Sequence, residues 1–156
     1  MASSLSTRQI AEAGRLLVRY RLLLEGIETT PVETPTRYHL ATRVAQDEAT
    51  TIAVYANRAP KPAGGTGRAA LAWMLDGTSE ADLVAVADLS TNRVWIFRTT
   101  EAIEVAQQHP PSGEHHLIMV TDAGLTRSKH DRILDTDFSE FLLERRAAEL
   151  LTPGVV

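Results

Sequence analysis

The chain has 156 residues, a length that fits one compact domain with a core of its own. Hydrophobic residues make up 44% and charged residues 23%, both near the globular average, which excludes a wholly disordered chain. The absence of cysteine excludes disulfides, zinc–thiolate sites and thiol nucleophiles. Residues 1–6 lack a secretory pattern and no apolar run reaches the roughly 18 residues of a membrane span, so we expect a cytoplasmic protein without membrane contact.

The net charge of −4 is unevenly distributed along the chain. Residues 1–70 carry nine Lys or Arg against six Asp or Glu, a balance of +3, whereas residues 71–156 carry seven against fourteen, a balance of −7. An acidic chain disfavours tight nonspecific binding to nucleic acid. The basic first half still leaves room for a local phosphate-binding patch.

The first predicted element is a helix over residues 7–25. Ser6 and Gln9 have capping-box spacing, and Gly26 is a natural terminator. Helical spacing predicts one apolar face, made by Ile10, Ala13, Leu17, Tyr20 and Leu24 and widened by Leu16 and Leu23. The opposite side carries charged residues at three- and four-residue steps, namely Arg8, Glu12, Arg15 and Arg19.

The next part of the chain has the composition of strands. A β-branched run at 27–32 is followed by two predicted strands, 37–44 and 50–57, with a polar turn between them. Residues 58–68 hold two prolines, three glycines and three cations, which predicts a mobile loop. Another strand is expected over residues 69–75.

The strongest hairpin signal is the pair of apolar runs 82–88 and 93–98, joined by a polar turn. Both faces of these strands are apolar, which predicts that both are covered. A short helix over 101–108 and a strand over 116–121 follow. A last helix over 138–151 is expected to be capped by Asp137 and to stop before Pro153.

This order of elements predicts an α/β fold with a mixed, largely antiparallel central sheet flanked by helices. One domain over residues 1–156 is expected, with its core at about 7–122 and the C-terminal helix at about 137–151.

Two segments carry a resemblance to a known family. The helix GRLLVRYRLLLEG and the hairpin ADLVAVADLSTNRVWIF, with two strands and a basic loop between them, resemble the PD-(D/E)XK nuclease superfamily. Among its members, the chain looks most like the small single-domain proteins that are similar to homing and restriction endonucleases and junction resolvases. The resemblance covers about residues 8–122 and implies a restriction-endonuclease-like fold.

The same resemblance identifies the positions at which family members hold a divalent metal ion, which activates water for phosphodiester cleavage. The family places a glutamate after the helix glycine, an aspartate on the next strand, and an acidic or amide residue two positions before a lysine. The matching positions here hold Arg15, His39, Ala53 and Tyr55. The resemblance therefore implies a nuclease fold without catalytic residues, metal or cofactor.

Cations of the first half are the candidates for DNA contacts, because arginine and lysine bind phosphate. They are Arg15, Arg19, Arg58, Lys61 and Arg68. The alternative for the helix arginines is a solvated surface, and for the others a plain exposed connection. Our first hypothesis is a catalytically degenerate nuclease-like domain that serves as a DNA-binding or regulatory module.

Two further hypotheses remain open. One is a homo-oligomeric protein-interaction protein, a dimer whose face is supplied by the C-terminal helix through Phe138, Phe141, Leu142 and Leu151. The other is a Mg²⁺-dependent nuclease whose metal ligands have moved to Asp76, Glu80, Asp82 or Asp88. A histidine metal site is disfavoured, because the neighbours His115 and His116 on one strand point to opposite faces, which leaves His109 without a third ligand.

Overall fold

A computed structural model describes the chain over residues 4–33, 38–42, 49–63, 68–122 and 132–151. The elements in chain order are α1 (Thr7–Leu24), β1 (Thr29–Glu33), β2 (Tyr38–Thr42), β3 (Thr51–Asn57), β4 (Lys61–Ala63), β5 (Arg68–Asp76), β6 (Leu83–Asp88), β7 (Arg93–Arg98), α2 (Thr99–Val105), β8 (Glu114–Val120), the 3-10 helix η1 (Asp135–Phe141) and α3 (Leu143–Leu151). None of the helices within these ranges is long and apolar enough to cross a membrane.

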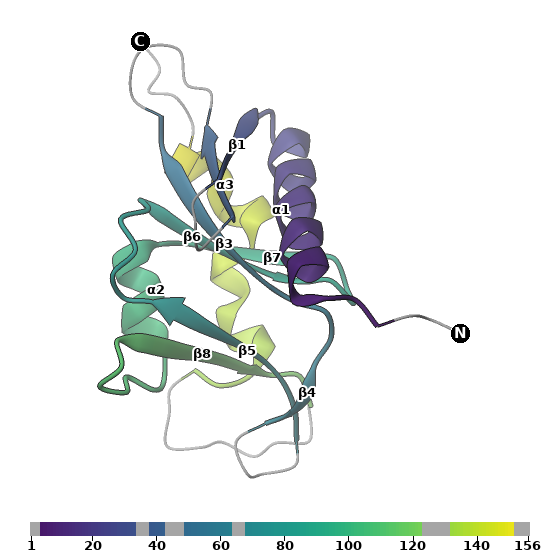
Figure 1. Cartoon of the computed structure of the whole chain (residues 1–156), viewed down its shortest axis with the longest axis vertical. Coiled ribbons are helices and arrows are strands. Elements are labelled where there is room, and N and C mark those ends of the chain that lie inside the picture. The colour runs from purple at the N-terminus through teal and green to yellow at the C-terminus, as the bar shows by residue number, and fades with distance from the viewer. Residues whose placement is uncertain (1–3, 34–37, 43–48, 64–67, 123–131, 152–156) are drawn as a thin grey trace.

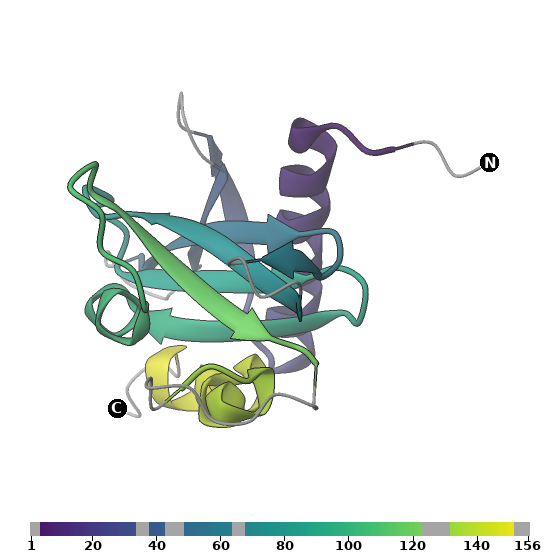
Figure 2. The same cartoon turned by 90° about the horizontal axis from the view of Figure 1, so that it is seen from below.

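The elements form layers around a five-stranded sheet of order β1-β2-β3-β6-β7 (Figures 1 and 2). Its neighbouring strands are antiparallel except for the parallel pair β3 and β6. One face packs against α1 and α3, and the other packs against a three-stranded sheet of order β4-β5-β8, together with α2 and η1. This arrangement confirms the predicted α/β fold with a mixed, largely antiparallel sheet flanked by helices.

The predicted hairpin of β6 and β7 is confirmed and lies at the centre of the packing. Every residue of β6 is buried, as are the four inner residues of β7. Their side chains alternate between two apolar clusters, one on each face of the sheet. Sheets covered on both faces have such uninterrupted apolar strands, and the apolar runs in the sequence therefore predicted the burial of these two strands correctly.

The predicted capping of α1 is confirmed, but the predicted buried face of this helix is wrong. Ser6 Oγ accepts a hydrogen bond from the Gln9 amide at 3.1 Å, and Gln9 Oε1 accepts one from the Ser6 amide at 2.8 Å. Tyr20 and Leu24, expected in the core, are 59% and 64% exposed, whereas Val18 and Leu22 are fully buried.

A glycine explains why the side of α1 that is buried differs from the predicted one. A Cβ atom added at Gly14 would overlap the Cβ atom of Ala56 on β3, so the missing side chain lets the helix approach the sheet closely. The contact line then runs through Gly14, Val18 and Leu22 at four-residue steps. Apolar residues surround most of α1, and hydrophobicity alone therefore did not select the buried side.

Two short predictions are corrected in their bounds. Within the loop expected over residues 58–68, Lys61–Ala63 form β4, antiparallel to the start of β5, while 64–67 lie outside the described residues. The helix expected over 101–108 spans Thr99–Val105 instead. It begins early because Glu101 Oε1 accepts a hydrogen bond from the Arg98 amide at 2.8 Å and so caps the helix. The polar turn before β3 and the stop at Pro153 also lie outside the described residues.

The single C-terminal helix predicted over 138–151 is wrong. The chain forms η1, breaks at the extended residue Leu142, and continues as α3. Asp137 accepts hydrogen bonds from the amides of Ile133 and Leu134, so it caps η1 rather than a helix beginning at Phe138.

The break has a packing cause. Phe138 and Phe141 belong to the cluster on one face of the sheet, whereas Leu143 and Leu151 belong to the cluster on the other. Leu142 forms a β-bridge with Trp95 on β7 where the chain passes from one face to the other. A single straight helix could not place these side chains on both faces of the sheet. The same packing buries Phe138, Phe141 and Leu151 inside the molecule, so they do not form the exposed dimer face that the sequence predicted for the C-terminal helix.

An ion pair joins α2 to α3. Arg146 is buried, and its Nη1 donates to Glu101 Oε1 at 2.9 Å. Partial burial raises the pKa of Glu101, but the hydrogen bonds from Arg146 and the Arg98 amide, together with both positive charges, outweigh it. The net effect holds the pKa below its ordinary value.

We expect Gly14→Ala to destabilise the protein by about 1–3 kcal/mol, because the overpacking against Ala56 exceeds the ~1 kcal/mol gain in helix propensity. Urea unfolding measures the change in free energy. Adding Ala56→Gly to the variant should recover part of the loss, and a stable Gly14→Ala protein would contradict the close approach of α1.

We expect Glu101→Gln to lower the free energy of unfolding by about 1–2 kcal/mol at neutral pH, since it removes a charged hydrogen-bond partner of buried Arg146. A carboxyl with a depressed folded-state pKa stabilises the fold above its unfolded pKa, and this contribution is lost as the pH falls through the folded pKa. The difference from wild type should therefore shrink at acidic pH. Glu104→Gln, an exposed position of α2, is the matched control, and a difference that persists in acid would contradict the assignment.

Candidate functional site

The two positions on β3 that the resemblance to nucleases matches lie within the apolar core. Ala53 is fully buried and Tyr55 is 8% exposed, and both pack in the cluster that includes Trp73 and Leu75 of β5. The Tyr55 hydroxyl accepts a hydrogen bond from the Asp76 amide at 3.1 Å. This side of β3 is therefore filled by side chains of the three-stranded sheet.

The other two family positions lie on different elements. His39 is on β2, where the strand register sets it opposite Ala53. Arg15 is on α1, which packs against the side of β3 that carries Val54 and Ala56. Arg15 is itself buried and forms an ion pair with Glu12. The register thus groups the β2 and β3 positions, while Arg15 is carried by a helix on the other face of the sheet.

The four carboxylates considered as migrated metal ligands are dispersed. Asp82 precedes β6 and Asp88 ends it, a separation of about 20 Å at the rise of an extended strand. Asp82 Oδ2 accepts hydrogen bonds from the Thr51 amide at 3.0 Å and the Thr51 hydroxyl at 3.1 Å. Asp76 closes its own turn by accepting from the Thr78 amide, and Glu80 is exposed. Within the described ranges, no three His, Asp or Glu side chains gather in a way that could hold a metal ion.

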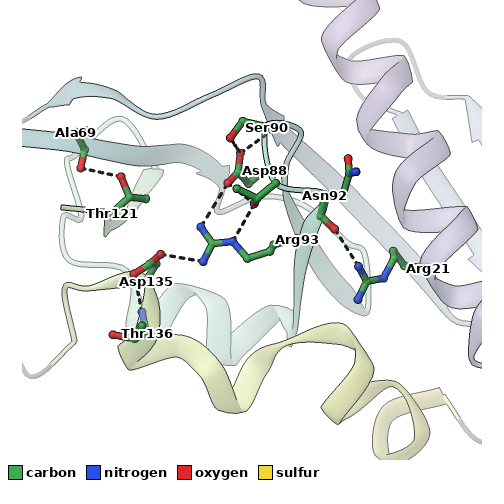
Figure 3. A network of polar contacts seen from close by, with 10 residues as sticks. Arg21, Ala69, Asp88, Ser90, Asn92, Arg93, Thr121, Asp135 and Thr136 are labelled. Atoms are coloured by element: carbon green, nitrogen blue, oxygen red, sulfur yellow. Dashed lines mark hydrogen bonds and ion pairs between the residues drawn. The ribbon is translucent and has the colours of Figure 1, made fainter. Parts of the chain in front are cut away.

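Asp88 is fully buried and is the centre of a structural network (Figure 3). Its Oδ1 accepts hydrogen bonds from the Ser90 amide at 3.0 Å and the Ser90 hydroxyl at 2.6 Å, and its Oδ2 accepts from Thr91 Oγ1 at 2.7 Å. Arg93 pairs with Asp88 at 3.4 Å and with Asp135 of η1 at 2.8 Å. Both carboxylate oxygens of Asp88 are thus engaged in holding the β6–β7 turn against η1.

The histidines form a contact that sequence reasoning missed. His115 and His116 diverge as strand alternation predicts, since His116 Nδ1 meets Gln108 Oε1 at 3.1 Å. His115 Nδ1 instead lies 2.8 Å from Nδ1 of His109, which requires one ring to donate and the other to accept. The turn before β8 that brings the two rings together has no sequence signal beyond its prolines and glycine.

The five candidate DNA-binding cations fall into two groups. Three of them have partners within the fold: Arg15 pairs with Glu12, Arg68 pairs with Asp122 at 3.3 Å, and Arg19 Nη2 donates to the Thr29 carbonyl at 3.4 Å. The other two are Arg58 and Lys61, which are exposed and form no ion pair with any other described residue.

Arg58 directly follows β3, in the connection to β4, and Lys61 is the first residue of β4. Arg58 lines a shallow hollow of about 630 Å³ together with Leu16 of α1 and Asn92 of the β6–β7 turn. Lys61 lies opposite Ala70 in the β4–β5 pair. Lys61, which the sequence predicted to lie in a mobile loop, is therefore held on a sheet by the short strand β4.

Comparison with known proteins supports the fold. No protein-family model matches the sequence. No curated protein matches it either. Among solved structures, the chain is similar to a bacterial homing endonuclease, I-Ssp6803I, with a TM-score of 0.58 and 12% sequence identity. The similarity covers 94% of this chain and 97% of the endonuclease chain. The protein therefore has a homing-endonuclease-like fold.

Proposed function

We propose that this domain binds duplex DNA without cleaving it. The observation that carries the absence of cleavage is the burial of Ala53 and Tyr55 beneath β5, at the positions where the resemblance to nucleases expects a metal ligand and a lysine. The overall similarity to a homing endonuclease supports a nuclease-related domain, and DNA binding by this domain is our proposal.

The chemistry of cleavage explains why these two residues argue against activity. Metal-dependent phosphodiester hydrolysis needs carboxylate oxygens around a divalent ion, with an open coordination position for water and phosphate. A methyl group at position 53 supplies no ligand. The phenol of Tyr55 is not the ammonium group that a lysine would supply, and its oxygen accepts a hydrogen bond from the Asp76 amide. Their burial also leaves no approach for a phosphate group.

The binding half of the proposal depends on Arg58 and Lys61. Both side chains are exposed, Arg58 directly after β3 and Lys61 at the start of β4, and neither forms an ion pair with a carboxylate among the described residues. An exposed cation without an internal partner keeps its full charge for a phosphate. The other three candidates have protein partners that DNA would need to displace, so we assign them a secondary part. Binding to backbone phosphates predicts weak sequence preference and strong salt dependence.

Fluorescence anisotropy of labelled duplex and branched DNA at two salt concentrations, with and without Mg²⁺, tests the proposal. We expect salt-sensitive binding and intact DNA on a gel afterwards. Arg58→Ala/Lys61→Ala should weaken binding and reduce the slope of log affinity against log salt by about 1.8, which is about 0.9 for each lost phosphate contact.

Arg145→Ala is the matched control, because Arg145 is an exposed cation on α3 beside acidic residues. This variant should bind as wild type does. Binding that ignores salt, or that survives loss of Arg58 and Lys61, would contradict the assigned interface. Mg²⁺-dependent cleavage products would contradict the loss of catalysis.

A further inference from the structure

The connection from α2 to β8 folds back on β8 as a short hairpin at the periphery of the molecule (Figures 1 and 2). The His116 amide of β8 donates a hydrogen bond to the Gln108 carbonyl at 2.9 Å, and the Gln107 amide donates one to the His116 carbonyl at 3.1 Å. A turn closes the hairpin, because the Gly113 amide donates to the Pro110 carbonyl at 3.1 Å. Backbone hydrogen bonds thus fix the residues on both sides of the turn.

The register of this hairpin sets His109 directly opposite His115. Gln108 and His116 form a β-bridge and exchange backbone hydrogen bonds, so the next residues toward the turn face each other. In an antiparallel ladder, the pair beside a hydrogen-bonded pair is the one whose side chains lie closer together. The Nδ1 atoms of His109 and His115 are accordingly 2.8 Å apart. Strand alternation separates His115 from His116, as the sequence predicted, and His109 is its neighbour instead.

The end of β5 holds the His115 ring and the turn in place. Gly77, which follows β5, has no side chain, and a Cβ atom there would lie 2.7 Å from Nε2 of His115. The Gly77 amide also donates to the Gly113 carbonyl at 2.9 Å, which joins the turn to the end of β5. His116 has a contact of its own, with its Nδ1 3.1 Å from Gln108 Oε1. The fold itself therefore orients the two facing rings.

Two imidazole nitrogens that face each other at this distance are able to chelate one metal ion. Zn²⁺ binds nitrogen ligands at about 2.0–2.1 Å, which sets two bound nitrogens about 3.0–3.4 Å apart. The separation of 2.8 Å needs to widen by about half an ångström to reach this range. Imidazole suits Zn²⁺, Cu²⁺ and Ni²⁺, whereas Mg²⁺ and Mn²⁺ prefer oxygen ligands. The pair therefore suits a transition-metal ion rather than the Mg²⁺ of phosphodiester cleavage.

We propose that His109 and His115 form a binding site for a transition-metal ion such as Zn²⁺, which both Nδ1 atoms ligate. Within the described ranges no third His, Asp or Glu side chain joins the pair, so water fills the remaining positions and the ion stays exchangeable. Binding needs both Nδ1 atoms without a proton. The hydrogen shared by the rings moves to Nε2 of its own ring by exchange with solvent, and a positively charged ring releases its extra proton. The inference stands apart from the proposed DNA binding, because it depends on neither Arg58 nor Lys61.

Calorimetric titration of the full chain with Zn²⁺ tests the site, and we expect one ion per chain. His109→Gln and His115→Gln should each weaken binding by about tenfold or more, because each removes one of two linked ligands. The double variant should be little weaker than either single variant, since one histidine alone no longer chelates the ion. His116→Gln is the matched control, because His116 is the next residue of β8 and faces the other way. Circular dichroism would verify that all variants are folded.

Nuclear magnetic resonance of the labelled ring nitrogens gives a readout that a merely structural contact would not change. Zn²⁺ should shift the Nδ1 signals of His109 and His115 together and leave the signals of His116 in place. The affinity should also fall in acid, where protons compete with the ion for the rings. Absence of binding at millimolar Zn²⁺ would overturn the proposal. An equal loss in His116→Gln, or losses that add in the double variant, would overturn it as well.

Discussion

The structure depends on the double burial of the central strands. β3 and β6 lie side by side in parallel within a sheet that is covered on both faces, so their successive side chains enter two separate cores. Ile52 and Val54 pack beneath α1, whereas Ala53 and Tyr55 pack beneath β5. A charged side chain on either face would be buried without water and would need a partner of its own. This constraint links the fold directly to the proposed loss of a metal site.

The same constraint explains how the two ends of the chain are arranged. α1 reaches β3 closely because Gly14 has no side chain to collide with Ala56. The C-terminal segment crosses the edge of β7 at Leu142, so that η1 can complete one core and α3 the other. Polar interactions then hold these pieces in place, with Asp88 and Arg93 at the turn and Glu101 with Arg146 between the helices.

Local patterns in the sequence predicted the elements well, and failed where two elements meet. The uninterrupted apolar runs identified the β6–β7 hairpin and its double burial, and Ser6 with Gln9 marked the start of α1. The buried side of α1 depends on the close contact between Gly14 and Ala56, which lie some forty residues apart in the sequence. Helical periodicity within α1 gives no information about this contact. The broken C-terminal helix had a similar cause, because only the position of β7 requires Phe141 and Leu143 to face different cores.

For the candidate site, too, local sequence predicted some features, whereas others depend on contacts between elements. Residue type and order alone led to the positions that the nuclease resemblance matches and to the basic connection after β3, and their roles stay predictions. Which cations have partners was a tertiary property: Asp122 lies more than fifty residues from Arg68, and the burial of Arg15 follows from the rotation of α1. Of the five cations predicted to contact DNA, Arg58 and Lys61 are exposed and form no ion pair with another described residue, and this difference is the basis of our proposal.

The most direct test of this account is a titration of the isotope-labelled protein with Mn²⁺, followed by nuclear magnetic resonance. A bound paramagnetic ion broadens the signals of nearby nuclei. With the β3 face closed by the core, the amide signals of His39, Ala53 and Tyr55 should broaden no more than those of other buried residues. Selective broadening of these three signals would show a divalent ion at the nuclease position and would contradict the central claim.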